Sequence, residues 1–392
     1  MRAGASAPVL LCLRRPGGGV GRGRLAAFGW LAALGLGCGS PTVPRQPTPA
    51  TRSSAEAGPA PAASERDEPG WLRGQLHLHS DASGDSHTPP ADVARWYAAH
   101  DYDFIVFTDH NRITEVEAPP GLLVFRGIEL TQNLDTCDPP PQPGLACLLH
   151  VNGLFVGTNT EDIGALPSPT EPDRLELYGH AMRVTETLGG VAMLDHPNVH
   201  YAADTELLVA LAHRGLTMFE VANEAVDSNN AGDASHPSTE AMWDGALTSG
   251  ARLWGVATDD AHHYGDAEAV RARGEVAHVG DRGWVMVRAE PDEVSIRSAL
   301  ERGDFYASNG VELTEVRVDG STLEVVAAES VRPHHFVFIG PDGEVLHEQR
   351  GQRASFTVAP EYVGYVRVRV TDRGGRRAWT QPVWFGDASA PP

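Results

Sequence analysis

Apolar and polar residues in the middle of the chain follow two alternating patterns. Phe104–Phe107 is entirely apolar and is followed by Thr108-Asp109-His110. This is typical of a buried parallel strand that delivers polar side chains at its C-terminal end. Before it, apolar side chains recur at helical spacing over 89–100, and Thr88 is the expected N-cap of that helix. Strand patterns and helix patterns continue to alternate in this way to about residue 306.

This alternation predicts an α/β protein. The expected strands cover 72–77, 103–107, 122–128, 151–156, 190–194, 216–221, 252–257 and 283–287, and the expected helices cover 89–100, 173–188, 204–214, 236–249 and 291–302. About seven or eight β-α steps of this kind favour a parallel barrel over an open sheet. We expect that barrel to occupy residues 71–309.

The pattern changes after Asn309. Short runs of alternating apolar and polar residues are separated by turn pairs, among them Asp319-Gly320 and Gly374-Gly375. No helical periodicity interrupts these runs, which cover 316–320, 322–327, 336–339, 355–358, 366–370 and 382–385. We therefore expect a small all-β sandwich over 310–387.

The first 70 residues predict export. A basic segment ending at Arg24 precedes an apolar stretch over 25–36, and Cys38 follows shortly after it. This resembles a bacterial lipoprotein signal peptide over 1–38, with Cys38 acylated; an ordinary cleaved signal or an uncleaved anchor is the alternative. The protein is then a lipoprotein of the bacterial cell envelope, periplasmic or at the surface, whose membrane contact is the lipid on Cys38. Residues 39–70, rich in Pro, Ala, Ser and Thr, are expected to form a disordered linker.

Composition narrows the choice of partners. The hydrophobic content of 41% is sufficient for a sizeable core. The sequence contains no lysine, and its formal net charge is −21. Such an acidic protein repels polyanions, so we expect no nucleic-acid partner. A small-molecule ester substrate, including a phosphorylated one, stays possible because bound metal ions reverse the local sign of charge.

Two cysteines bracket a proline-rich segment in the middle of the chain, Cys137 and Cys147. In an exported protein, cysteines on either side of a segment that cannot form regular structure are expected to form a disulfide.

Residues that can bind a metal ion occur at or just beyond the end of one predicted strand after another. His77 and His79 point to the same face of an extended strand, because strand side chains alternate with a period of two. Glu129 ends another strand, where its carboxylate can bridge two cations. In a barrel these positions share the rim where catalytic groups assemble. The metal-capable residues are His77, His79, His110, Glu129, His150, His196, Glu220, Asp260 and His262.

Four motifs in order resemble those of the PHP (polymerase and histidinol phosphatase) superfamily of metallohydrolases. They are His77-Leu78-His79, Thr108-Asp109-His110, Asp195-His196-Pro197 and Asp260-Ala261-His262. The resemblance spans 72 to about 308 and implies a distorted (β/α)7 barrel that holds two or three divalent ions, Mn, Zn or Fe. A C-terminal β domain after the segment 305–310 is similar to the carbaryl-hydrolase-like branch, in which some members cleave carbamate or carboxyl esters.

The resemblance also implies which residues bind each ion. One ion takes His77, His79, Glu129 and Asp260; a second shares Glu129 and takes His150 and His196; a third takes His110, His262 and an aspartate of the first loop. Family members often place that aspartate at the position of Gly84, so here the ligand is Asp85, our choice, or Asp81. If neither reaches the ion, the site is binuclear. Asp109, Asp195 and Glu220 are expected to orient the imidazoles or bound waters.

These observations predict a divalent-metal-dependent hydrolase that uses a metal-activated water, with phosphate esters as the leading substrate class. The alternative is hydrolysis of carboxyl esters or carbamates at the same metal site. A non-catalytic cell-envelope binding protein is an alternative of another class. Arg112, Arg126 and Arg183 are candidates to bind phosphate oxygens. His200, His263 and Arg112 are candidates to assist a leaving group.

Overall fold

The computed structural model describes residues 69–158 and 172–386. The predicted signal peptide with its Cys38 anchor, and the predicted linker except for its last two residues, lie outside these ranges. No helix in the described part of the chain is long and apolar enough to cross a membrane.

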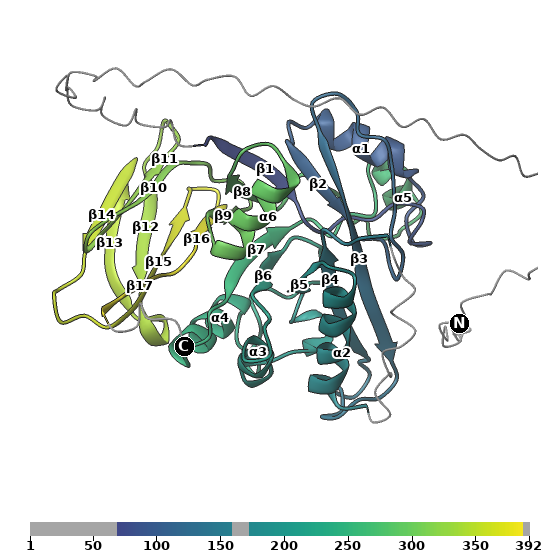
Figure 1. Cartoon of the computed structure of the whole chain (residues 1–392), viewed down its shortest axis with the longest axis horizontal. Helices are drawn as coiled ribbons and strands as arrows, with labels where there is room; N and C mark the ends of the chain where they lie inside the picture. Colours follow the sequence, from purple (N-terminus) through teal and green to yellow (C-terminus); the bar gives the residue numbers. More distant parts are fainter. Residues whose placement is uncertain (1–68, 159–171, 387–392) are drawn as a thin grey trace, which may run out of the picture. The chain divides into compact units, whose positions relative to one another are not determined.

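The chain is a mixed α/β protein with a large sheet and few helices, as the alternating pattern predicts (Figure 1). The elements up to residue 308 are β1 (Trp71–Gln75), α1 (Pro90–Ala98), β2 (Phe104–Phe107), β3 (Leu123–Leu134), β4 (Cys147–Leu154), α2 (Arg174–Thr187), β5 (Val191–Leu194), α3 (Thr205–Ala212), β6 (Met218–Asn223), α4 (Thr239–Thr248), β7 (Trp254–Thr258), α5 (Ala267–Ala272), β8 (Trp284–Arg288), α6 (Glu293–Arg302) and β9 (Phe305–Ser308). A short 3-10 helix covers Val199–Tyr201. The sequence did not reveal α5 and β9, because 6 and 4 residues are too few to show a period.

Local capping explains where most of these helices begin. The side chains of four N-cap residues each accept a backbone N–H three positions later, namely those of Asp173, Asp204, Ser238 and Asp292. Helix α1 is different: its N-cap is Pro89 and no side chain caps it, so the prediction of Thr88 as the cap is wrong. Pro90 occupies the first helical position, where its fixed φ suits the helix and its missing N–H costs nothing.

Fourteen of the described strands belong to one hydrogen-bonded sheet. Strands β1, β2 and β3 pair in parallel, and so do β5, β6 and β7. The chain after β7 also bonds to the chain after β1, since the His79 N–H donates to the Ala261 oxygen at 2.9 Å and the Asp260 N–H donates to the His77 oxygen at 3.1 Å. The residues that follow these two strands therefore lie side by side.

Strand β4 departs from the expected parallel order. It pairs antiparallel with both β3 and β5, because a loop and not a helix joins β3 to β4. The Cys137–Cys147 disulfide, with an S–S distance of 2.00 Å, closes this loop and confirms the predicted pairing. Strand β8 likewise runs antiparallel to β1. The expectation of an all-parallel series is therefore wrong at these two strands.

Between Asn309 and Gly386 the described chain contains β-strands and one short 3-10 helix, Pro341–Gly343. The strands are β10 (Leu313–Asp319), β11 (Thr322–Ala327), β12 (His334–Ile339), β13 (Val345–Gly351), β14 (Arg353–Thr357), β15 (Gly364–Thr371), β16 (Arg377–Thr380) and β17 (Val383–Phe385). Strands β10, β11 and β14 form a sheet of three, while β12, β13, β15, β16 and β17 extend the large sheet, because β16 pairs with β9. Side chains from both sheets, such as Phe338 and Phe356, form a common core.

A buried ion-pair network joins α4 to β15. Arg367, whose side chain is 1% exposed, donates from Nε to Asp244 Oδ1 at 2.7 Å and from Nη2 to Asp244 Oδ2 at 2.6 Å. Glu240 on the same helix accepts from Arg369 at 3.1 Å and from Arg377 at 3.2 Å. The late strands are thus tied to a helix that packs on β6 and contributes Trp243 to the core.

We expect Arg367→Gln to lower the free energy of unfolding by about 3–5 kcal/mol, because it leaves the Asp244 carboxylate buried without its cation. Arg376→Gln is the matched control, since Arg376 is 63% exposed and pairs with Asp372 at the surface. Its effect should stay within about 1 kcal/mol. Urea denaturation measures the free energy of unfolding of both variants. Equal losses would show that the buried ion pair contributes no more to stability than the exposed one.

Candidate metal centre

The structure brings all nine predicted ligands together at one edge of the sheet. They form overlapping groups of three or four residues whose ligand atoms lie within 4.8 Å of one another. Strand ends position some of them: His77 and His79 follow β1, and Asp260 follows β7. Thr108, after β2, holds the first pair in place, because its Oγ1 accepts from the Leu78 N–H at 3.0 Å and donates to the Leu78 oxygen at 3.1 Å. The expectation that Glu129 ends a strand is wrong, because β3 continues to Leu134 and pairs there with β4, whose interior carries His150.

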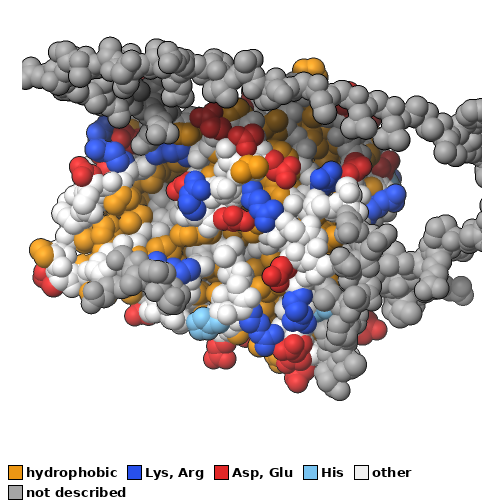
Figure 2. Space-filling view, in the orientation of Figure 1, with side chains coloured by type: hydrophobic (Ala, Val, Ile, Leu, Met, Phe, Trp, Pro, Cys, Tyr) orange, Lys and Arg blue, Asp and Glu red, His pale blue; other side chains and the backbone are white. Residues whose placement is uncertain are grey.

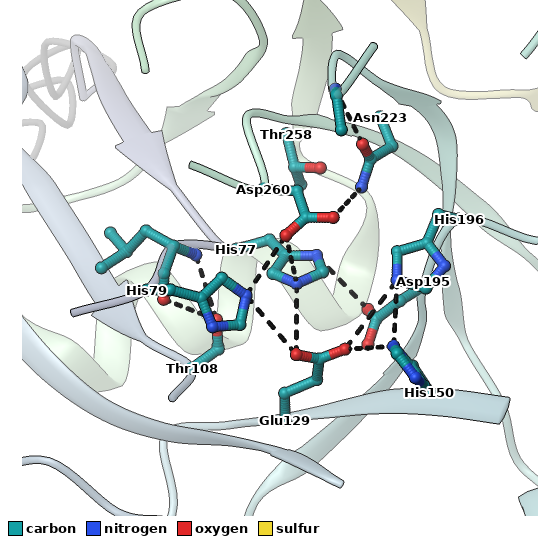
Figure 3. Close-up of polar contacts among 12 residues, drawn as sticks. His77, His79, Thr108, Glu129, His150, Asp195, His196, Asn223, Thr258 and Asp260 are labelled. Atoms are coloured by element: carbon teal, nitrogen blue, oxygen red, sulfur yellow. Dashed lines mark hydrogen bonds and ion pairs between the residues drawn. The ribbon is translucent and has the colours of Figure 1, made fainter. Parts of the chain in front are cut away.

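Glu129, on β3, lies at the centre of this edge (Figure 3). One carboxylate oxygen, Oε2, is 3.4 Å from His79 Nε2 and 3.7 Å from His77 Nε2. The other, Oε1, is 2.6 Å from His150 Nδ1 and 3.8 Å from His196 Nε2. Oε2 also lies 2.5 Å from His110 Nδ1, so the two oxygens face different groups of imidazoles, as a carboxylate that bridges two cations would.

Several buried polar atoms of this cluster lack a hydrogen-bond partner. The described residues supply none to the Nε2 atoms of His77 and His79, and the Glu129 oxygens have imidazole nitrogens at 2.5 and 2.6 Å but accept no well-aligned hydrogen bond. The Glu129 side chain is only 1% exposed. Leaving buried polar and charged groups unpaired is costly, so native proteins rarely tolerate it without a compensating ion or water. The donor set therefore fits divalent metal ions.

A third group lies nearer the surface. Asp85 Oδ2 is 2.9 Å from His110 Nε2 and 3.4 Å from His262 Nε2, and the ligand atom of His79 is within the same 4.8 Å. Asp81 is exposed and belongs to no such group among the described residues. Of the two aspartates that the sequence left open, the geometry favours Asp85.

The charges of the cluster attract cations. Burial alone would lower the pKa of His110, but the Glu129 and Asp85 carboxylates raise it to about 11. Burial likewise tends to raise the pKa of Glu129, and the imidazoles of His110 and His150 lower it well below its usual range. Burial lowers the pKa of His79 to about 4, so this imidazole is neutral at physiological pH, whereas His110 has to release its proton to bind a metal ion.

Glu220 orients His77. Its Oε1 is 2.7 Å from His77 Nδ1 and accepts from the Thr258 hydroxyl at 2.5 Å, while its Oε2 accepts from the His196 N–H at 2.6 Å. A carboxylate that accepts all these bonds places the His77 proton on Nδ1 and leaves the Nε2 lone pair toward Glu129 and Asp260. This placement agrees with the orienting role expected for Glu220.

Ser83, which the sequence analysis did not single out, does the same for His79. Its Oγ donates to Asp109 Oδ1 at 2.8 Å and accepts from the His110 N–H at 3.0 Å. It is also 2.9 Å from His79 Nδ1. The single hydroxyl proton of Ser83 is used in the hydrogen bond to Asp109. His79 Nδ1 must therefore be the donor to Ser83, and His79 Nε2 keeps its lone pair for a metal. Asp109 thus acts on His79 through Ser83. In the sequence, the feature that could have indicated this role is the position of Ser83 between two predicted ligands, His79 and Asp85.

Asp195 belongs to a further group with His77 and Glu220, whereas Arg126 and Arg183 lie away from the cluster. Asp195 Oδ1 is 3.9 Å from His77 Nδ1, beyond hydrogen-bond distance, and both its carboxylate oxygens lack a partner in the described chain. Arg126 binds the exposed Glu115 and the Val156 oxygen. Arg183 lines a hollow beside Val191, at the start of β5, whereas His196 follows the end of that strand.

Three further residues proposed from the sequence make contacts of other kinds. Arg112 is exposed, although it follows His110 closely in the chain. His200 Nδ1 bonds to the Ala146 backbone, and His263 Nδ1 accepts from the His278 N–H at 3.1 Å. These bonds are structural, and they give His200 and His263 no contact with a ligand atom of the cluster.

Ser83→Ala is expected to weaken metal affinity by about 10–100-fold, because His79 loses the group that fixes its tautomer. Ser80→Ala is the control: Ser80 Oγ also donates to Asp109, at 2.8 Å, but it contacts no imidazole in the described structure. Metal affinity is measured by competition with a chromogenic chelator, alongside the melting temperature of the metal-free proteins. Equal affinities in the two variants would contradict the assigned role of Ser83.

Comparison with known proteins adds little to this geometry. No protein-family model matches the chain, and a search of curated proteins finds no match. Among solved structures, an amidohydrolase from Chromobacterium violaceum with bound sulfate and no metal has 13% identity, covers 52% of this chain and 90% of its own, and gives a TM-score of 0.30. A DUF3244 family protein with an immunoglobulin-like β-sandwich fold from Bacteroides vulgatus has 13% identity, covers 20% of this chain and 100% of its own, and gives a TM-score of 0.17. Similarities this distant assign neither family nor function, which must be inferred from the site itself.

Proposed function

We propose that this protein is a divalent-metal-dependent hydrolase of the PHP type. The observation that carries the proposal is the buried Glu129 carboxylate, whose two oxygens face separate groups of imidazoles and accept no well-aligned hydrogen bond from the described residues. In this proposal β1–β7 and the helices between them form the distorted PHP-type barrel, and the strands after Asn309 form the C-terminal β domain of the carbaryl-hydrolase-like branch. Export as a lipoprotein anchored through Cys38 is part of the same proposal.

Each ion has its own ligand set, formed by nitrogen and oxygen atoms as Mn, Zn and Fe prefer. The proposed sets are His77, His79, Glu129 and Asp260; Glu129, His150 and His196; and Asp85, His110 and His262. Asp260 joins the first set because its Oδ1 is 3.2 Å from His79 Nε2 and 3.4 Å from His77 Nε2. When bound, such ions lower the pKa of a water toward neutrality and offer positive charge to a substrate oxygen.

The protein's own residues prepare this chemistry. Ser83 and Glu220 hold two imidazoles in the tautomer that binds metal. Asn223 donates to Asp260 Oδ2 at 3.3 Å and to Glu220 Oε2 at 2.9 Å, so one amide orients a ligand carboxylate and the group that supports it. Preorganised ligands lose less freedom when metal and substrate bind, and this lowers the cost of reaching the transition state.

Phosphate esters are the leading substrate class. When bound, the ions would offer positive charge directly to a substrate oxygen within an otherwise acidic chain. An anionic substrate gains from that charge. Hydrolysis of carboxyl esters or carbamates is the second candidate, favoured because Arg126 and Arg183 lie away from the cluster and do not supply donors for free phosphate oxygens.

The test is metal analysis of the purified protein followed by assay of p-nitrophenyl phosphate, bis(p-nitrophenyl) phosphate, p-nitrophenyl acetate and an aryl methylcarbamate, with and without Mn, Zn or Fe. We expect metal-dependent release of the phenol from at least one phosphate ester. Turnover of the acetate or carbamate alone would assign the second candidate. Bound metal without any turnover would favour a cell-envelope binding protein.

A further inference from the structure

One face of the β3–β4 hairpin carries a row of polar side chains, Glu129, Thr131 and Asn133, because alternate residues of a strand point to the same side. Thr131 is paired directly with His150 in the antiparallel register of β3 and β4. Glu129 and Asn133 are therefore the two diagonal neighbours of His150 on that face, and diagonal neighbours of this kind can reach an imidazole ring. The hairpin thus places a different polar side chain on either side of His150.

The two ring nitrogens of His150 make different contacts. Nε2 forms a hydrogen bond with Asn133 Oδ1 at 2.7 Å. Nδ1 is 2.6 Å from Glu129 Oε1 and 3.2 Å from His196 Nε2. Although the first of these two distances is short, the Glu129 oxygen accepts no well-aligned hydrogen bond from the described residues. Nδ1 therefore faces the carboxylate without donating a proton to it.

The contact with Asn133 determines which nitrogen of His150 carries the proton. An amide oxygen can only accept a hydrogen bond, so Asn133 Oδ1 places that proton on Nε2. A neutral imidazole has one N–H, and its other nitrogen, here Nδ1, then offers a lone pair to a metal. This is the reverse of His77, in which Glu220 holds the proton on Nδ1 and leaves Nε2 for the metal.

The atoms around Nδ1 are spaced as the ligands of one ion would be. His150 Nδ1, His196 Nε2 and Glu129 Oε1 lie in pairs 2.6, 3.2 and 3.8 Å apart. Ligand atoms of a tetrahedral ion with bonds of about 2.1 Å lie roughly 3.4 Å apart. Figure 3 shows His150 and His196 on one side of Glu129, and His77 and His79 on the other. These three atoms therefore suit an ion separate from the one beside His77 and His79.

We propose that Asn133 is a positioning residue that makes His150 bind the second ion through Nδ1, whereas His77 and His79 bind through Nε2. The assignment rests on the metal centre of the proposed function and adds to it both the binding atom and the residue that selects this atom. Asn133 is exposed, so it can be replaced without disturbing the core.

The first measurement is zinc affinity, by competition of the whole protein with a chromogenic chelator. Asn133→Leu removes the acceptor and should weaken the binding of one zinc ion about 10–100-fold, while the other zinc ions keep their affinity. Asn133→Asp keeps an acceptor oxygen and should bind every ion at least as tightly as the wild type. Histidine side chains are sparse on the face shown in Figure 2, so that face offers no cluster of imidazoles to compete for added zinc.

Gln132→Leu is the matched control. Gln132 lies on the other face of the same strand and donates to the Leu177 oxygen at 3.2 Å, so this variant also removes one hydrogen bond of the hairpin. It should leave the affinity for every zinc ion unchanged. The melting temperature of metal-free Asn133→Leu should stay close to that of the wild type, because the replaced side chain is exposed.

The second measurement is ¹⁵N NMR of the zinc-loaded protein, which distinguishes a metal-bound ring nitrogen from a protonated one. We expect the His150 signals, identified by their loss in His150→Gln, to show zinc on Nδ1 and a proton on Nε2.

Zinc on Nε2 of His150 would overturn the proposal. So would wild-type affinity for every ion in Asn133→Leu, or equal losses in Asn133→Leu and Gln132→Leu, since equal losses would trace the effect to the stability of the hairpin. Zinc binding without hydrolysis of any ester would reject the proposed hydrolase and leave this assignment standing. A wild-type protein that binds no zinc would reject both.

Discussion

Glu129→Gln is expected to reduce hydrolysis by about 1,000-fold or more. An ion at such a site stabilises the transition state by several kcal/mol, and each 1.4 kcal/mol corresponds to a factor of ten in rate. The amide has the size of the carboxylate but lacks its charge, and it offers one oxygen where the proposed ions need two. His79→Ala should have a similar effect, because it removes a ligand from the same group.

Metal-dependent stability provides a second measurement of the same change. Ions that bind only the native state raise its melting temperature, so the wild-type protein should gain stability when Mn or Zn is added, and Glu129→Gln should lose most of that gain. Glu115→Gln is the control, since Glu115 is exposed and pairs only with Arg126 among the described residues. Full activity with full metal content in Glu129→Gln would show that this carboxylate does not bridge the ions.

Asp85→Asn should release one of the three proposed ions and most phosphoesterase activity while leaving the fold intact. The reason is that Asp85 contributes the only carboxylate of the group formed with His110 and His262, and its side chain is 49% exposed, so no core packing is lost. Asp81→Asn removes the same charge from the same loop and should cause neither the loss of an ion nor the loss of activity. Metal content by mass spectrometry, activity and the melting temperature are measured together.

The possible outcomes of this pair are distinct. Loss of metal from Asp81→Asn alone would make Asp81 the ligand and contradict the geometry, in which Asp85 Oδ2 is 2.9 Å from His110 Nε2. Loss from neither variant would mean that the centre holds two ions. The comparison therefore also tests whether moving the loop aspartate one position beyond Gly84 preserves its role.

Much of the site could be predicted because its residues occur in short regular segments. The alternation of a strand predicted that His77 and His79 share a face, and both join the metal cluster although β1 ends at Gln75. Phe104–Phe107 is apolar because it is buried on both sides. The pairing of the strands then brings Glu129, within β3, and Asp260, after the end of β7, to one edge. For these elements, local periodicity and the rules of parallel strands were sufficient.

Other features depend on contacts that no local pattern encodes. Whether Asp81 or Asp85 faces the imidazoles is decided by the turn between them, and Ser83 acquires its role only because the fold places His79, Asp109 and His110 around its hydroxyl. Likewise, β16 pairs with β9 and extends the large sheet into the C-terminal strands, although neither segment has a sequence feature that indicates its partner.

The sequence by itself therefore determined the α/β class, the disulfide and the set of metal-capable residues. Only the tertiary structure decided the antiparallel course of β4, the loop aspartate nearest the imidazoles and the role of Ser83. The physical reason is the distance along the chain over which the interactions act. Strand and helix periods arise from interactions between near neighbours, whereas loop conformation and strand partners depend on packing between residues far apart in the chain.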